Sequence, residues 1–131
     1  MLALASLAIA SCSGGESVKT GEATVEHFHN RYNAQQLSEI YRDAAPELQK
    51  AGAEPEFLTF MTAVRRKLGA YKSGKTLQWH VNYGTGGTIV TLAREARFER
   101  GEGTEKFVLR DAGDKALLVG YNIESRALVV N

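Results

Sequence analysis

Cysteine, net charge and long hydrophobic runs are all scarce in this sequence, and each shortage excludes a class of protein. Cys12 is the only cysteine, so no disulfide can form within the chain and the hydrophobic core must hold the fold. Lys and Arg number 16 and Asp and Glu 15, a formal net charge of +1, which provides no excess of cations to neutralise a run of nucleic-acid phosphates. We therefore expect no nucleic-acid partner.

Residues that bind metals or carry out catalysis are equally sparse. His27 and His29 stand two apart on an expected helix, so their side chains point in different directions, whereas ligands on one helix face need a spacing of three or four. His80 falls on the polar side of an expected strand. Ser, His and Asp all occur, yet no local signature such as a nucleophile elbow positions them. We expect three surface histidines, no metal, no cofactor and no catalytic residue.

The most apolar segment stands at the N-terminus. Residues 1–11, MLALASLAIAS, are uncharged and too few to cross a bilayer as a helix, and they are typical of the core of a secretion signal. The basic residues that usually precede such a core are missing, which indicates a truncated signal. The following tetrapeptide, Ile9-Ala10-Ser11-Cys12, resembles the bacterial lipobox. The alternative is an ordinary unmodified cysteine in a frayed N-terminus.

The lipobox resemblance implies where in the cell the protein is located. In proteins with that motif the cysteine is lipidated, with palmitate among its acyl chains, and becomes the new N-terminus. The protein would then be held at the membrane of a bacterial cell envelope. Ser13, rather than Asp, after the cysteine resembles proteins passed on to the outer membrane of Gram-negative bacteria. We expect residues 12–21 to form the lipidated cysteine and a flexible tether, and residues 22–131 to form one domain.

Helical periodicity runs from Glu22 to Gly69 in three segments. The first ends near Asn33, the second ends near Pro46, and the third begins at Pro55, which suits a first helical position. Gly69 provides the residue that most readily ends a helix. The apolar stripes of the three segments are Val25, Phe28 and Tyr32; Leu37, Ile40 and Tyr41; and Phe57, Phe60, Met61, Val64 and Leu68.

After Gly74 the apolar period changes from 3.6 to 2, which indicates four strands. The connections GTGG, GEGT and DAGD are short, so neighbouring strands should be antiparallel. The residues predicted to face the core are Leu77, Trp79, Val81 and Tyr83; Val90, Leu92, Ala96 and Phe98; Phe107 and Leu109; and Leu117, Val119, Tyr121 and Ile123.

Three helical segments followed by a four-stranded meander predict an α+β fold, with helices packed on one face of a curved, cone-like sheet. The helix PEFLTFMTAVRRKLG, the segment VTLAREARFERGEGTEKFVLR and the ending ALLVGYNIES resemble the nuclear-transport-factor-2-like and cystatin-like superfamily. The closest likeness is to small bacterial lipoproteins of that class. None of these segments is a catalytic signature, so the resemblance implies a fold and no activity.

One octapeptide, GAYKSGKT, matches the phosphate-binding pattern G-x-x-x-x-G-K-[ST]. A P-loop needs a strand before its glycines and a helix that begins at its Lys-Ser/Thr, because the helix N-terminus then points at the phosphates. Here a helix ends at Gly69 and a strand begins at about Thr76. We therefore interpret Gly69, Gly74, Lys75 and Thr76 as a connection without nucleotide.

The curved sheet and its helices could enclose a pocket. Arg94 falls on the inward side of its strand, where it could meet an anionic ligand. The interpretation that we favour is that Arg94 lies at a bulge or reaches the rim while the aromatic residues fill the core, because long strands often bulge. The aromatic candidates for the pocket lining are Tyr32, Tyr41, Trp79, Tyr83 and Tyr121.

Two functions follow from these expectations. Enzymes of this general fold resemble one another in placing an acidic residue or His inside the cone, and in the predicted alternation no Asp, Glu or His faces inward. A register error of one residue would bring His80 and Glu95 inside. We therefore expect an exported, lipid-anchored, non-catalytic binding or interaction domain of unknown protein or small-molecule ligand. The alternative is a small-molecule enzyme or carrier. The open sheet edges suit strand addition or a homodimer.

Overall fold

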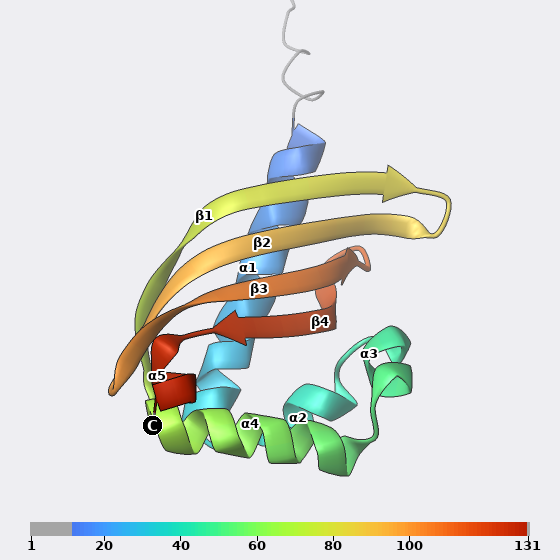
Figure 1. Ribbon diagram of the computed structural model, residues 1–131. Helices are drawn as coiled ribbons and strands as arrows, with labels where there is room; N and C mark the ends of the chain where they lie inside the picture. Colours follow the sequence, from blue (N-terminus) through green and yellow to red (C-terminus); the bar gives the residue numbers. More distant parts are fainter. Residues whose placement is uncertain (1–11, 131) are drawn as a thin grey trace, which may run out of the picture.

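The computed structural model describes residues 12–130, and its order of elements confirms the predicted α+β class (Figure 1). The predicted secretion signal, residues 1–11, lies outside the described residues. The elements are α1 (Cys12–Asn33), α2 (Leu37–Arg42), α3 (Pro46–Ala51), α4 (Glu54–Leu68), β1 (Tyr71–Gly84), β2 (Gly87–Phe98), β3 (Gly101–Asp111), β4 (Ala116–Glu124) and α5 (Arg126–Val130).

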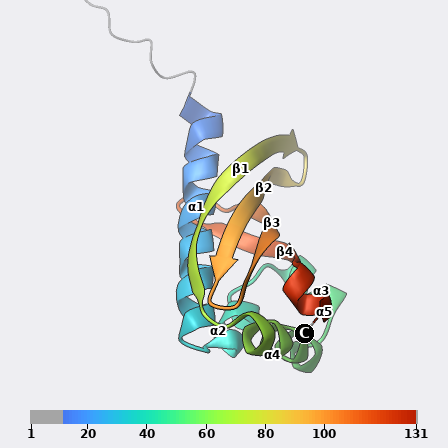
Figure 2. The ribbon, with the colours of Figure 1, turned by 60° about the vertical axis from the view of Figure 1, so that its left-hand side comes forward.

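The four strands form one open antiparallel sheet in the order β1-β2-β3-β4. The sheet is curved, and α1 crosses its inner face, with its N-terminal turns projecting past the edge strand β1 (Figure 1, Figure 2). The helices α2, α3 and α4 gather at the opposite end of the molecule (Figure 1). Among the described residues, none of the helices combines the length and apolar character needed to cross a bilayer.

The helix α1 begins ten residues earlier than predicted, so the tether expected over residues 13–21 is helical instead. Ser17 donates a hydrogen bond to the Asp111 carboxylate at 2.8 Å, and Val18 packs against the core. Gly21 allows the close approach, because a Cβ built there would lie 3.1 Å from Cδ1 of Leu109. Contacts with the sheet thus override the weak helix propensity of this Gly- and Ser-containing segment.

The helix predicted from Pro55 is confirmed as α4. Its Met61, Val64 and Leu68 are buried, and Gly69 follows with a φ of 79°, in the region that favours glycine. The short helix α3 was not predicted. It begins at Pro46, which occupies a first helical position although we had expected it to end the preceding helix.

Three register shifts interrupt the sheet; one lies between Tyr71 and Ser73, and the other two change the predicted alternation. The inward residues of β2 and β3 are buried as predicted. In β1 the pairing with β2 shifts between Thr76 and Gln78, so Leu77 leaves the inward set. In β4 a shift opposite Val108 and Leu109 places Leu118 at the core, where Leu117 and Val119 had been expected. A bulge adds one residue to one strand, which reverses the face of every residue on one side of it.

Candidate functional site

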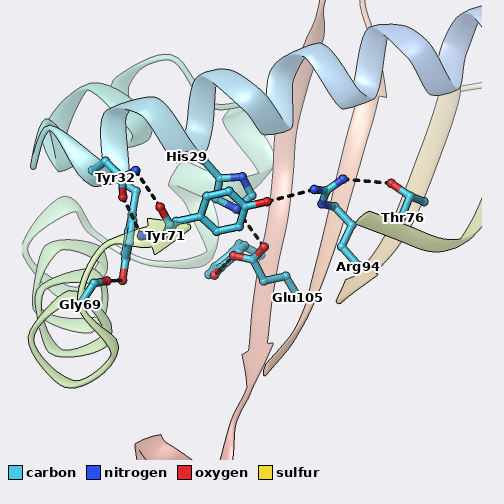
Figure 3. Close-up of polar contacts among 9 residues, drawn as sticks. His29, Tyr32, Gly69, Tyr71, Thr76, Arg94 and Glu105 are labelled. Atoms are coloured by element: carbon cyan, nitrogen blue, oxygen red, sulfur yellow. Dashed lines mark hydrogen bonds and ion pairs between the residues drawn. The ribbon is translucent and has the colours of Figure 1, made fainter. Parts of the chain in front are cut away.

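A chain of polar side chains lies between α1 and the inner face of the sheet; it consists of two hydrogen-bonded groups joined by the stacking of Tyr71 on His29 (Figure 3). Each of the five elements α1, β1, β2, β3 and β4 contributes to it. The residues are Glu22 and His29 from α1, Tyr71 and Thr76 from β1, Arg94 from β2, Glu105 from β3 and Tyr121 from β4.

The buried end of this chain is built around the Glu105 carboxylate, which is 0% exposed. One of its oxygens lies 2.9 Å from Nε2 of His29, and the other accepts a hydrogen bond of 2.7 Å from the hydroxyl of Tyr121. Burial is the main cause that raises the pKa of Tyr121 well above its usual value, and the charge of Glu105 is the next. The phenol therefore stays protonated and acts as the hydrogen-bond donor to Glu105. These two partners replace the water that a carboxylate loses on burial.

Packing holds His29 in place. The ring of Tyr71 stacks on the imidazole, with centroids 3.5 Å apart and planes 3° apart. The rings of Phe28 and Phe107 meet the imidazole edge-on. The sequence prediction of a surface residue was therefore wrong for His29. Its position, four residues after Val25, places it on the buried face of α1, and this spacing is visible in the sequence.

Glu105 was also missed. It stands two residues before Phe107 in β3, and both residues face the core. The expectation that no Asp, Glu or His faces inward on a strand was wrong for this residue, since period-two alternation from Phe107 already points it inward. His80 and Glu95, which a register error would have brought inside, are exposed.

Arg94 faces inward, as predicted, and forms the other end of the chain. Nη1 donates to the hydroxyl oxygen of Thr76 at 3.0 Å, and Nη2 donates to the hydroxyl oxygen of Tyr71 at 3.2 Å. Thr76 in turn donates to the Glu22 carboxylate at 2.8 Å. The Nε atom of Arg94 is buried and has no hydrogen-bond partner among the described residues, and no described carboxylate forms a direct ion pair with this guanidinium.

A pocket of about 390 Å³ opens beside Arg94 and His29. Acidic and basic side chains both border this pocket. Its lining residues are Glu22, Val25, Glu26, His29, Asn30, Asn33, Tyr71, Lys72 and Arg94.

A second pocket, of about 480 Å³, lies on the other flank of α1, against α2 and β4. Its Arg31 and Asp43 already form an ion pair of 2.7 Å, so these two charges satisfy each other. Lys115, which also lines the second pocket, is exposed. The first pocket is the better candidate for a site that recognises a charged ligand, because the guanidinium that borders it has a buried Nε without a partner in the described chain.

The structure does not bring the five predicted aromatic residues together. Tyr32 fills the core and donates to the carbonyl of Gly69 at 2.7 Å, and burial raises its pKa strongly, since nearby Arg65 offsets only part of the effect. Tyr121 packs in the core against Phe28 and Phe107.

The other three predicted aromatic residues lie elsewhere. Tyr41 packs on Phe57, and its hydroxyl lies 2.9 Å from the carbonyl of Gly52, away from the sheet. Trp79 and Tyr83 are 56% and 59% exposed. The five aromatic residues that we expected around one cone thus lie in three separate places in the fold.

The P-loop-like residues lie in a helix end and a strand. Gly69 follows α4 directly, while Gly74, Lys75 and Thr76 belong to β1, so the order is helix then strand, the reverse of a P-loop. The ammonium of Lys75 lies 4.0 Å from the carboxylate of Glu95 on the outer face. Within residues 12–130, no group of three His, Cys, Asp or Glu side chains is arranged to hold a metal ion.

Comparison of the chain with known protein families and with curated proteins finds no match. The interpretation of the site therefore depends on its own geometry.

Proposed function

We propose that the protein is an exported, lipid-anchored, non-catalytic binding domain whose ligand is a small molecule with one negatively charged group, received by Arg94. The single observation that supports this proposal is the incomplete pairing of the guanidinium. It bonds to two neutral hydroxyl oxygens, its Nε has no partner among the described residues, and it borders a pocket.

Charge and geometry favour an anionic group in that pocket. A cation removed from water is stable only when its hydrogen bonds and charge are compensated, and a planar guanidinium matches a carboxylate with two parallel bonds. Glu22 and Glu26 border the same pocket and would repel a multiply charged anion. A ligand that also carries an ammonium group, as an amino acid does, satisfies both signs of charge.

The anchoring part of the proposal rests on the lipobox-like residues 9–12. In the described chain Cys12 is the first residue of α1, so an acylated Cys12 would join the lipid to a helix rather than to a tether. The resemblance to small lipoproteins of the nuclear-transport-factor-2-like class supports the same address. Mass spectrometry of the mature N-terminus, with Cys12→Ser as the control, tests it, and an unmodified cysteine in the mature protein would disprove the anchor.

Binding can be tested with a panel of amino acids and simple carboxylates. We expect some of them to raise the melting temperature of the native protein and of Arg97→Gln, and to leave Arg94→Gln unchanged. Arg97 is the matched control because it lies three residues along the same strand, exposed on the outer face and paired with Glu102. If Arg94→Gln responded like the native protein, the pocket would not be the site.

One observation favours the alternative, a small-molecule enzyme or carrier. His29 borders the pocket and is held by a carboxylate, as in sites where an acidic residue orients an imidazole for proton transfer. If the protein converted a bound ligand, and His29→Gln retained binding but lost turnover, this alternative would replace a purely binding role.

A further inference from the structure

The hairpin of β1 and β2 carries apolar side chains on its inner face that the described chain covers only in part: Val81 packs against the core, while Trp79 and Tyr83 are mostly exposed. We use the name hairpin surface for Trp79, Val81 and Tyr83, which follow one another on the inner face of β1. Trp79 pairs with Leu92 and Tyr83 with Thr88, so both share the inner face of the sheet, yet each is more than half exposed.

The segment that forms the hairpin also carries no acidic side chain, lysine or arginine: residues 76–93 contain no Asp, Glu, Lys or Arg. An exposed edge strand normally carries charges, lysine above all, because they prevent pairing with other chains. In β1 the two lysines, Lys72 and Lys75, stand before this uncharged segment. A surface of this composition suits contact with an apolar or interfacial medium rather than with water alone.

The hairpin surface lies at the end of the molecule where α1 begins. In both ribbon views, related by a turn about the vertical axis, the first turns of α1 and the β1–β2 hairpin occupy the upper part of the molecule, with the tip of the hairpin pointing to the side, and α4 lies at the bottom (Figure 1, Figure 2). Val18 packs on the core, and at a rise of 1.5 Å per residue Cys12 lies about 9 Å beyond it along α1. Lipid attached to Cys12 would bring a bilayer close to this end.

We infer that the hairpin surface is a membrane contact, with Trp79 and Tyr83 in the headgroup region and the edge of β1 facing the lipid. This inference rests on the proposed lipid anchor. Trp and Tyr are the residues enriched at the membrane interface, because their rings are apolar and their polar atoms find water and headgroups. The unpaired backbone groups at the β1 edge are tolerated there, since the headgroup region is hydrated, unlike the hydrocarbon.

The proposed contact leaves the ligand site accessible. The Arg94 pocket takes its helical residues from Glu22 to Asn33, the half of α1 that points away from Cys12. A domain held by its lipid and its hairpin would therefore turn this pocket away from the bilayer.

The test uses the fluorescence of Trp79, which is the only tryptophan of the chain. The full lipidated protein is reconstituted into vesicles of phosphatidylethanolamine and phosphatidylglycerol, with and without bromine on the acyl chains. We expect the emission to shift to shorter wavelength relative to the Cys12→Ser protein without vesicles, and brominated lipid to quench it. Emission that stays at the solvent-exposed wavelength and is not quenched would overturn the inference.

Two substitutions of exposed aromatic residues provide the matched comparison. Tyr83→Asp adds a charge to the hairpin surface, and we expect the quenching by brominated lipid to be lost. Phe60→Asp makes the same kind of change in α4, at the far end, where Phe60 is 43% exposed, and we expect quenching to remain. Circular dichroism checks that both variants fold. Equal loss of quenching in both variants would contradict a specific contact through the hairpin.

The remaining outcomes separate this inference from the proposed function. A lipidated Cys12 with unquenched Trp79 would refute the membrane contact and leave the anchor intact. If Trp79 were shielded in native membranes but not in lipid vesicles, a protein partner would cover the hairpin surface, and the inference would be wrong. An unmodified Cys12 would remove both anchor and contact, while binding at Arg94 would still be tested by Arg94→Gln.

Discussion

Replacement of Glu105 is the most direct test of the polar chain in the core. Glu105→Leu removes the hydrogen-bond partner of two buried groups, Nε2 of His29 and the hydroxyl of Tyr121, which lie 2.9 Å and 2.7 Å from its oxygens. A buried polar group left without its partner costs about 1–3 kcal/mol. With two such groups we expect the free energy of unfolding to fall by about 2–6 kcal/mol, a large part of the about 5–15 kcal/mol typical of a domain.

Glu105→Gln should cost far less, about 1 kcal/mol, because the amide oxygen still accepts from Tyr121 and the amide nitrogen remains a hydrogen-bond partner for the ring of His29. Urea unfolding at neutral pH, followed by circular dichroism, measures both variants. Glu95→Gln is the control, since its exposed pair with Lys75 should contribute less than about 1 kcal/mol.

A second comparison separates the stability lost through unpaired polar groups from the stability that depends only on burying these side chains. The triple variant His29→Leu, Glu105→Leu, Tyr121→Phe removes donors and acceptor together, so we expect it to recover most of the stability lost in Glu105→Leu. The reasoning would be refuted if Glu105→Leu were as stable as the native protein, or if the triple variant were less stable than the single one.

Two further predictions concern the tyrosines and a glycine. Tyr32 and Tyr121 hold their protons more tightly in the folded state than in the unfolded state, so their contribution to stability is complete below the ordinary pKa of about 10 and is lost as the pH rises above it. We expect an ultraviolet titration to show these two phenols ionising only as the protein unfolds, and early ionisation of all five tyrosines would contradict their burial. Gly69→Ala should lower the free energy of unfolding by about 1–3 kcal/mol, because Gly69 has a φ of 79° and a Cβ there would lie 2.6 Å from the Glu99 carboxylate. Gly86→Ala, at a position where a Cβ meets nothing within 4 Å, is the control in the same denaturation assay.

The candidate site was only partly predictable. The alternation in β2 placed Arg94 inward, because β2 pairs with β3 without a bulge and its buried residues, Val90, Leu92, Ala96 and Phe98, keep a period of two. The partners of Arg94 were not predicted. Thr76 faces it only because the pairing of β1 shifts at Leu77, and Tyr71 reaches it from a part of β1 that had been interpreted as a connection.

The sequence alone determined the class of the fold and most of the core. Apolar periods of 3.6 and 2 arise from the geometry of one helix or strand, so Val25, Met61, Leu92 and Phe107 could be assigned to the core without knowing their neighbours.

Only the tertiary structure decided what the polar residues do. Whether His29, Glu105 and Arg94 are exposed, paired or turned toward a ligand depends on contacts between segments up to 76 residues apart and on register shifts that no local pattern marks. The same holds for Trp79 and Tyr83. Their alternation places them on the inner face, but the course of α1, which crosses the sheet without covering the hairpin, leaves them exposed.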